Sequence, residues 1–289
     1  MSPTSTVEDR YSRFVDIAGL EMHYSEWGID NDEPLVCWHG FSRVGRDYDP
    51  IARELADEYR VICPELPGRG LSEWSREPST EYTMDAYAEY AVEFIDTLGL
   101  DTVRWLGTSM GGNLGIRVGG RELRDRISHL VLNDAGPGHP EGDTDEEGIE
   151  RIVEYLSNPP AFPTATRLEA YYRDVYEPFS EMTDAEWQRF TLTSARRNDD
   201  GAFRPSYDPG TVEPYFHDPA VMDQWDDWED ITADIFLLRG EHSDVVSEPE
   251  AERMRKHPNC RFLKIDDCGH APSLNVSSQV GPVRSFLAE

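Results

Sequence analysis

The sequence predicts an α/β fold, with a mostly parallel, doubly wound sheet and an inserted helical lid. Short apolar segments alternate with amphipathic segments along both ends of the 289-residue chain. This alternation is typical of strands that are buried on both faces and joined by covering helices. The alternation lapses for roughly a hundred residues in the middle of the chain. We therefore expect a core at 1–136 and 233–289 and a helical lid, or cap, at 137–232.

The first part of the core begins with a predicted hairpin over 13–28, which turns at Ala18-Gly19. Continuous apolar runs at 34–40 and 59–68 predict buried strands, and the amphipathic segment between them, with Pro50 near its start, predicts a helix. The elements expected next are a helix at 83–99, a strand at 102–108, a helix from Met110 and a strand at 129–134.

The second part of the core resumes the pattern with a predicted strand at 234–240. A helix at 248–257, a strand at 261–266 and a final helix follow. The lid between the two parts is aromatic and helical in character, and so many aromatic side chains need a surface to cover. We expect the lid to lie over the carboxyl edge of the sheet. Its aromatic residues are Tyr171, Tyr172, Tyr176, Trp187, Phe190, Trp225 and Trp228.

The chain carries 27 basic and 57 acidic residues, a formal net charge of −30. Such a charge repels nucleic acid and anionic lipid, so we expect neither as a partner. No run of about 18 apolar residues predicts a membrane span, and the polar first ten residues do not resemble a signal peptide. We expect a cytoplasmic protein, a monomer or homodimer, with a small molecule as its partner.

Cysteine usage supports the same compartment. Cys37 and Cys63 lie in apolar runs and are expected to be buried, and Cys260 and Cys268 flank a predicted strand that holds them apart. The sequence contains no C-x-x-C pair, so it predicts neither a zinc site nor a redox motif. Reduced thiols are the rule in the cytoplasm.

The acidity predicts adaptation to salt. Lys256 and Lys264 are the only lysines, so the surface is poor in lysine as well as rich in carboxylates. At low salt the mutual repulsion of these carboxylates favours the unfolded chain, and at about 1 M salt the Debye length shrinks to roughly 3 Å. We expect the melting temperature to rise markedly across thermal melts at about 0.05, 0.5 and 2 M salt, a range that spans weak to near-complete screening. A flat or falling series would make the acidity a solubility feature.

The segment "VRWLGTSMGGNLG" (103–115) contains the candidate nucleophile, Ser109. Gly107 and Gly111 complete a G-x-S-x-G pattern where a predicted strand meets a predicted helix. The turn there is so sharp that a side chain two residues before or after the serine would clash. This turn presents the hydroxyl above the sheet and aims a helix N-terminus at the same place. The context predicts a nucleophilic serine.

A serine hydroxyl needs a general base, and the base needs a carboxylate to orient it. His270 follows the last predicted strand and therefore lies at the same edge of the sheet, so we select it as the base. Asp244, in the loop after the strand at 234–240, is our choice for the acid. Asp134, after the preceding strand, and Glu241 are the alternatives.

The oxyanion of the tetrahedral intermediate needs N–H donors. The first is expected to be the backbone N–H of Met110, directly after the nucleophile. The second is expected from Phe41, in the loop after the strand at 34–40, although this residue can also form a wall of the pocket.

Six motifs together resemble the α/β-hydrolase superfamily, and the resemblance extends from residue 13 to the last helix. The chain is similar to lid-bearing bacterial esterases, lactonases and carbon–carbon hydrolases. Ser109 argues against the branches that use an aspartate nucleophile, and Thr108 and Ala271 depart from the carbon–carbon hydrolase pattern. The motifs are HGF (39–41), PELPGRGLS (64–72), GTSMGG (107–112), LNDAGP (132–137), RGEHSDVVS (239–247) and CGHAPSL (268–274).

The resemblance implies a serine hydrolase of small or medium esters or lactones, with neither a metal nor an organic cofactor. Two alternatives use the same scaffold. A carbon–carbon hydrolase would cleave a vinylogous diketone, its acidic substrate anchored by an arginine such as Arg173, Arg196 or Arg197. A ligand receptor would turn over slowly and signal through lid movement. Rapid hydrolysis of p-nitrophenyl esters would favour an enzyme.

Overall fold

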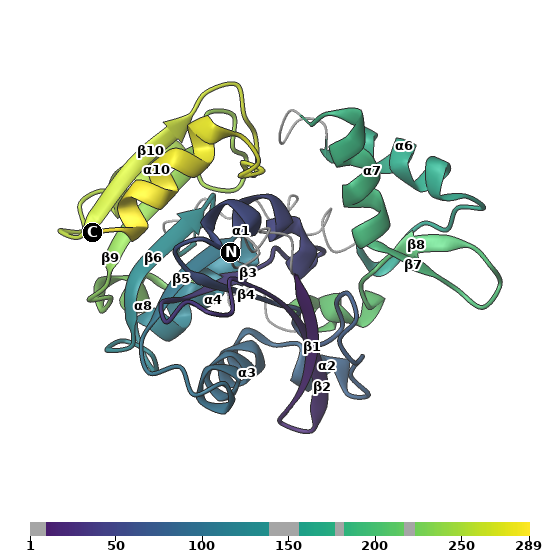
Figure 1. The fold of residues 1–289 in the computed structure, drawn as a ribbon, viewed down its shortest axis with the longest axis horizontal. Coiled ribbons are helices and arrows are strands. Elements are labelled where there is room, and N and C mark those ends of the chain that lie inside the picture. Colours follow the sequence, from purple (N-terminus) through teal and green to yellow (C-terminus); the bar gives the residue numbers. More distant parts are fainter. Residues whose placement is uncertain (1–9, 139–155, 177–181, 217–222) are drawn as a thin grey trace, which may run out of the picture.

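Eight strands form one continuous sheet in the order β1-β2-β4-β3-β5-β6-β9-β10 in this computed structural model (Figure 1). The structure describes residues 10–138, 156–176, 182–216 and 223–289. The strands are β1 (Tyr11–Ile17), β2 (Leu20–Trp27), β3 (Pro34–Trp38), β4 (Arg60–Pro64), β5 (Val103–Thr108), β6 (Ile127–Asn133), β9 (Asp234–Gly240) and β10 (Cys260–Ile265).

The sheet is parallel except at its first edge. Strand β2 pairs antiparallel with β1 and with β4, and every later pairing is parallel. The predicted hairpin is confirmed, because Ala18 and Gly19 connect β1 to β2 with φ of 51° and 81°, the positive φ pair that a tight two-residue hairpin turn requires. The carboxyl ends of β3 and of the parallel strands that follow therefore share one edge, where loops can converge.

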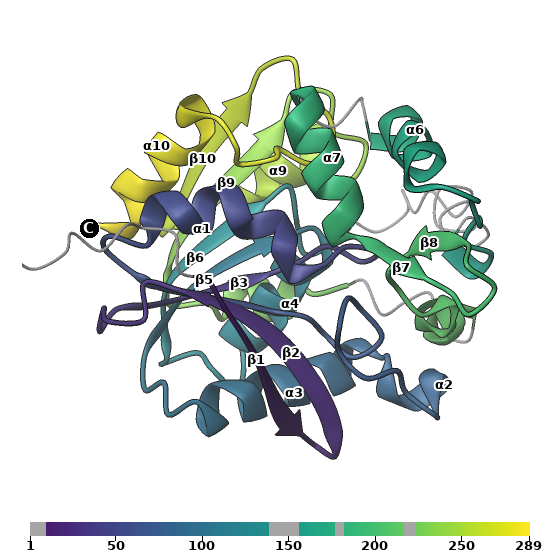
Figure 2. The same ribbon diagram turned by 45° about the vertical axis from the view of Figure 1, so that its right-hand side comes forward.

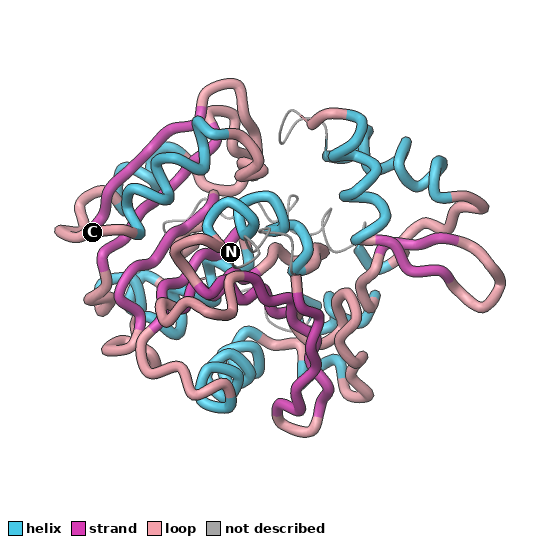
Figure 3. The backbone as a smooth tube through the Cα atoms, in the orientation of Figure 1, coloured by secondary structure: helices cyan, strands magenta, loops and turns pink. Residues whose placement is uncertain are grey.

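Helices cover both faces of the sheet (Figure 3). Strand β3 shows why: Leu35 and Cys37 pack in one buried cluster, and Val36 and Trp38 pack in another on the opposite face. Each face therefore has its own core, as the continuous apolar runs predict. The helices of the core are α1 (Asp49–Leu55), α3 (Met84–Thr97), α4 (Met110–Gly119), α8 (Trp225–Glu229), α9 (Glu248–Met254) and α10 (Ser277–Leu287), with the short α2 (Pro78–Glu81) and 3₁₀ helix η1 (Gly45–Tyr48).

The inserted segment forms a unit beside the sheet edge (Figures 1 and 2). Tyr172 and Trp187 are buried there in a cluster of the insertion's own side chains, so its aromatic residues largely cover one another. The segment also contains a two-stranded hairpin, which the sequence did not predict. Its elements are α6 (Ala165–Tyr176), α7 (Asp184–Thr193), β7 (Ala195–Arg197), β8 (Phe203–Pro205) and 3₁₀ helix η2 (Pro209–Phe216).

Helix α8 belongs to the core rather than to the lid. The sequence assigned Trp225 and Trp228 to the lid at 137–232, but both are buried in the core cluster that also contains Leu114 of α4. The ion pair between Arg121, just after α4, and Asp227 holds the same helix against the end of α4. The core therefore resumes about one helix earlier than the predicted boundary.

Two further expectations concern cysteines and membranes. All four cysteines are free thiols, and Cys37, Cys63 and Cys268 are buried. Within the described ranges, no helix has both the length and the apolar character needed to cross a bilayer.

Candidate active site

The turn between β5 and α4 presents Ser109. Its backbone has φ 52° and ψ −121°, a conformation that L-residues rarely adopt. A Cβ atom on Gly107 would overlap the backbone of Gly111, and one on Gly111 would overlap the carbonyl of Trp38. The turn can therefore close only with glycine at both positions, as the G-x-S-x-G pattern predicts.

Met110 is the first residue of α4, so its N–H has no acceptor within the helix. The partial positive charge of the helix N-terminus adds to the local field beside Ser109. On the other side, the backbone N–H of Ser109 donates to the carbonyl of Asn133 at 3.1 Å, which fixes the turn against β6. The predicted donor Met110 thus lies where an anion next to Ser109 would be stabilised.

His270 is hydrogen-bonded to Asp134. The two atoms, His270 Nδ1 and Asp134 Oδ2, are 2.7 Å apart. An ionised carboxylate can only accept, so Nδ1 carries the proton and Nε2 is left as an acceptor in the neutral ring. Asp134 is fully buried and follows β6, the neighbour of β5, which ends one residue before Ser109. The ring that the sequence selected as base therefore has an orienting carboxylate.

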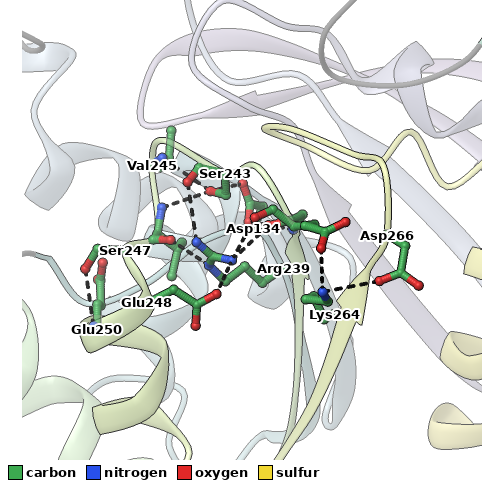
Figure 4. A network of polar contacts seen from close by, with 12 residues as sticks. Asp134, Arg239, Ser243, Val245, Ser247, Glu248, Glu250, Lys264 and Asp266 are labelled. Carbon is green, nitrogen blue, oxygen red and sulfur yellow. Dashed lines mark hydrogen bonds and ion pairs between the residues drawn. The ribbon is translucent and has the colours of Figure 1, made fainter.

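The predicted acid, Asp244, is wrong in this structure. Asp244 is exposed and has no hydrogen bond to His270, although both residues are described. The next residue back, Ser243, explains this, because its hydroxyl donates to Asp134 Oδ2 at 2.7 Å and accepts the N–H of Val246 at 3.1 Å (Figure 4). The loop turns on Ser243 and leaves Asp244 outside. The alternative that the sequence analysis kept open, Asp134, occupies the position.

Three groups donate hydrogen bonds to the Asp134 carboxylate. The N–H of Gly240 donates to Oδ1 at 3.2 Å, while Ser243 and His270 donate to Oδ2. Arg239 holds the loop that carries Ser243: its guanidinium donates to the carbonyl of Val246 at 2.7 Å and pairs with Glu248 at 3.1 Å (Figure 4). The Asp134 carboxylate is therefore held by residues at the ends of two strands, β9 and β10.

The predicted second oxyanion residue, Phe41, lies in a loop beside the nucleophile. A Cβ atom on Gly40 would stand 3.6 Å from Cβ of Ser109, so the backbone here is close to the serine. His39 anchors the loop, with Nε2 accepting from the N–H of Leu66 at 3.1 Å and Nδ1 donating to the Gly40 carbonyl at 2.8 Å. Burial lowers the pKa of His39 to about 3. His39 is therefore a neutral, structural ring.

Asn133 and Thr108 are site residues that the sequence analysis did not identify. The Asn133 amide donates to Thr108 Oγ1 at 3.0 Å and to the carbonyl of Pro272 at 2.8 Å. It thereby connects the strand end next to Ser109 with the loop that carries His270. A signal was available, because Asn133 directly precedes Asp134 at the end of a predicted strand.

A cavity of about 570 Å³ lies beside Ser109 and His270. Ser109, Met110, His270 and Phe41 all line it, together with residues of the lid. The structure gives no hydrogen bond between Ser109 and His270, and catalytic hydrogen bonds of this kind often tighten only with substrate bound. The rest of the lining is mainly apolar. The apolar residues include Met84, Leu156, Val175, Met182, Phe190, Val212, Val245 and Leu274.

Glu250 is a buried carboxyl group behind the turn that follows Asp134. It is 2% exposed, and its Oε1 accepts from the N–H of Gly138 at 3.0 Å. Its Oε2 has no partner in the described part of the chain. Burial, with a contribution from the charge of Asp134, raises the pKa of Glu250 to about 7.

The pKa of Glu250 predicts a pH-dependent effect of Glu250→Gln. Because the carboxyl pKa is raised in the folded state, the folded protein holds the Glu250 proton between about pH 4.5 and 7 while the unfolded chain has lost it. The free energy of unfolding is therefore at its full value below about pH 4.5 and falls as pH rises through about 7. Glutamine stays neutral, and we expect it to raise the melting temperature by a few degrees at about pH 8.5 relative to its effect at about pH 5. Thermal melts at both values measure this. An equal effect at both would contradict it.

One cluster of side chains has the composition of a metal site. Ligand atoms of Glu241, His242 and Asp267 lie within 4.8 Å of one another. Glu241 is already engaged, because it pairs with Lys264 at 2.7 Å and accepts the N–H of Asp267 at 3.2 Å. These contacts account for the arrangement without a cation.

The chain is similar to known proteins over nearly its whole length. The chain is 32% identical over 282 residues to a 3-hydroxybutyrate-oligomer hydrolase of Cupriavidus necator, which covers 93% of this chain and 94% of that protein. A solved alpha/beta hydrolase of Novosphingobium aromaticivorans superposes with a TM-score of 0.85 at 26% identity, covering 96% and 98% of the two chains. A solved protein of Rickettsia typhi gives 0.86 at 25%, covering 97% and 99%. The model of the alpha/beta hydrolase family matches residues 35–280. The chain is a hydrolase that belongs to the alpha/beta hydrolase family.

Proposed function

We propose that this protein is a serine hydrolase that cleaves small to medium carboxylic esters, lactones included, through an acyl-enzyme on Ser109. The observation that carries the proposal is the hydrogen bond between His270 and Asp134 at the wall of a cavity that Ser109 also lines. A serine, a base and a carboxylate that orients the base form the catalytic triad of acyl transfer, and Ser109, Asp134 and His270 follow one another in the nucleophile–acid–base order of this architecture.

Acylation begins with Ser109. Its Oγ attacks the ester carbonyl carbon while Nε2 of His270 takes the hydroxyl proton. The carbonyl π bond breaks and its electrons pass to the oxygen, which is stabilised by the N–H groups of Met110 and Phe41 and by the N-terminus of α4. Asp134 stabilises the imidazolium that forms. The intermediate then collapses, the bond to the alcohol oxygen breaks, and the imidazolium returns its proton to the leaving alcohol.

Deacylation repeats these steps with water. His270 Nε2 takes a proton from the water as its oxygen attacks the acyl carbon. The second tetrahedral intermediate expels Ser109 Oγ, which regains the proton from His270. The products are the carboxylic acid and the free enzyme, and no oxidant or reductant is consumed.

The cavity and one relative support a proposal for the substrate class. An apolar cavity of about 570 Å³ suits a short or branched acyl chain. The relative from Cupriavidus necator, alike over 93% of this chain, is described as acting on 3-hydroxybutyrate oligomers. Such an oligomer is a chain of ester-linked hydroxy acids with a free carboxylate at one end. We propose linear oligoesters of short hydroxy acids as one substrate class of this protein.

A substrate screen tests the proposal. Initial rates are measured on p-nitrophenyl acetate, butyrate, octanoate and palmitate, on a lactone, and on the dimer and trimer of 3-hydroxybutyrate. A ring-fission diketone is run beside them. We expect rapid turnover of the short esters and of the oligomers, and a steep fall at palmitate. Turnover of the diketone alone would identify a carbon–carbon hydrolase, and slow turnover of every compound would favour a receptor.

Arg189 predicts how the free carboxylate is recognised. It lines the cavity from α7, and its guanidinium has no hydrogen bond or ion pair within the described residues. Its helical neighbour Glu186 is hydrogen-bonded to Thr183 and Asn275, and the charge of Arg189 contributes to the lowered pKa of Glu186 without a direct ion pair. We expect Arg189→Gln to raise KM for the 3-hydroxybutyrate dimer about tenfold, a typical size for a charge-assisted hydrogen bond. KM for the methyl ester of the same dimer should stay the same. An equal change in KM for the dimer and for its methyl ester would contradict this role of Arg189.

A further inference from the structure

Arg69 is a fully buried arginine next to the two predicted oxyanion residues, and the mechanism above does not use it. It lies in the loop after β4 and is 0% exposed. Its Nε donates to the carbonyl of Phe41 at 3.0 Å, and one terminal nitrogen lies 3.8 Å from Sδ of Met110. The other terminal nitrogen donates to the carbonyl of Pro67 at 3.0 Å and to the hydroxyl of Tyr87.

The charge of Arg69 is not neutralised by a direct ion pair. No carboxylate lies within salt-bridge distance of it in the described ranges, although the chain has 57 acidic residues. Asp208, the acidic residue held nearby, accepts instead from the hydroxyl of Tyr82 at 2.8 Å. The rings of Phe41 and Tyr87 each lie 5.1 Å from the guanidinium carbon and offset part of the burial cost. Burying a cation without a counterion is expensive.

The loop that carries Arg69 is held independently of this side chain. The N–H of Gly70 donates to the carbonyl of Ser206 at 2.8 Å, and the N–H of Asp208 donates to the carbonyl of Gly68 at 2.7 Å. These backbone bonds join the core loop to the lid. The loop therefore keeps its anchor when the Arg69 side chain is replaced, and the guanidinium is needed for something other than the path of its own chain.

We infer that Arg69 is a positioning residue for the oxyanion site. A single planar guanidinium contacts the backbone of Phe41 and the side chain of Met110, and these are the two residues whose N–H groups are expected to bind the oxyanion. By holding the Phe41 carbonyl it fixes the orientation of that residue, and its fork geometry makes the contacts simultaneously. Oxyanion donors are effective when their positions are set before the charge develops. This inference rests on the proposed ester hydrolysis.

The test compares Arg69→Met and Arg69→Lys with the wild-type protein. Methionine keeps an apolar stem and loses every donor, and lysine keeps the charge but not the fork. For p-nitrophenyl butyrate we expect Arg69→Met to lower kcat about tenfold or more with little change in KM, below the 10²–10³ loss typical of removing an oxyanion donor itself. Arg69→Lys should lose less, about threefold. The matched control is Arg104→Met, since Arg104 also donates to a backbone carbonyl, that of Leu287, but near the far end of β5.

A binding measurement separates positioning from general damage to the structure. Ser109 Oγ adds to the carbonyl carbon of a trifluoromethyl ketone and forms an oxyanion. The matching methyl ketone binds in the same cavity without this addition. We expect the ratio of their affinities to fall in Arg69→Met by about the same factor as kcat, while the affinity for the methyl ketone is unchanged. Should the methionine variant not fold, the lysine variant decides. A ratio within about twofold of wild type in the folded variant overturns the inference, because removing even part of an oxyanion contact should cost more.

Failure of the inference and failure of the proposed function give different results. If the wild-type protein hydrolyses esters and the affinity ratio does not respond to Arg69, the role of Arg69 is wrong and the proposed function stands. If the wild-type protein hydrolyses no ester and shows no preference for the trifluoromethyl ketone, the proposed function is wrong. In that case the inference about Arg69 fails with it.

Discussion

Replacing Ser109 by alanine is expected to lower the rate of ester hydrolysis by about three to six orders of magnitude, the loss typical of removing a nucleophile. The acyl-enzyme cannot form without Oγ, and the residual rate comes from binding and from the oxyanion donors alone. The fold should persist, because the strained turn at Ser109 depends on the glycines at 107 and 111 rather than on the hydroxyl. Initial rates on p-nitrophenyl butyrate and a thermal melt measure both effects.

The control for this variant is Ser128→Ala. Ser128 lies near the opposite end of β6, where its hydroxyl donates to the carbonyl of Val103 at 3.4 Å. It reports what the loss of a serine hydroxyl does far from the cavity, and we expect wild-type rates. A Ser109→Ala protein that keeps more than a few per cent of wild-type activity would rule out the covalent mechanism.

The core of the fold was predictable because each of its strands carries a strong local signal. In β3 the residues Leu35 to Trp38 alternate between two buried clusters, so both faces must be apolar and the run reads as a continuous hydrophobic segment. Parallel strands buried in this way need covering helices. The G-x-S-x-G turn was equally predictable, since its glycines are required by contacts within a few residues and with the adjacent strand β3.

The lid was less predictable because its residues lack that local signal. Its aromatic side chains pack mainly on one another, so their pattern does not reveal which surface they face. The hairpin of β7 and β8 has only three residues in each strand, too few for a period of two to be evident. Trp225 and Trp228 are aromatic like the lid residues, yet they are buried in the core cluster. Their position in the sequence did not show whether these two tryptophans pack in the lid or in the core.

The choice between Asp134 and Asp244 required the tertiary structure. Both residues follow strands that end at the same edge, so chain order and strand position fit either one. Two local features decide between them. Asp134 adopts a positive φ of 53°, which helps to place its carboxylate in the buried interior, and Ser243 uses its hydroxyl to close a turn that leaves Asp244 exposed. Neither backbone conformation is evident in the residue types alone.

The acid assignment leads to the second prediction with a large effect, Asp134→Asn. Asparagine keeps the shape but cannot stabilise the imidazolium, and its amide N–H₂ favours the wrong tautomer of His270. We expect kcat to fall by about 10⁴, the size typical of this change in a Ser-His-Asp triad. Ester hydrolysis at several pH values measures it.

Asp244→Asn is the matched comparison, because it makes the same chemical change on an exposed residue at the edge of the same cavity. We expect its kcat to stay within about threefold of wild type, since an exposed carboxylate that does not contact the ring contributes little. Ser243→Ala should fall between the two, because it removes one of the donors to Asp134 Oδ2 and leaves the His270 bond in place. A larger loss from Asp244→Asn than from Asp134→Asn would mean that the loop after β9 rearranges when substrate binds and that Asp244, not Asp134, orients the base during catalysis.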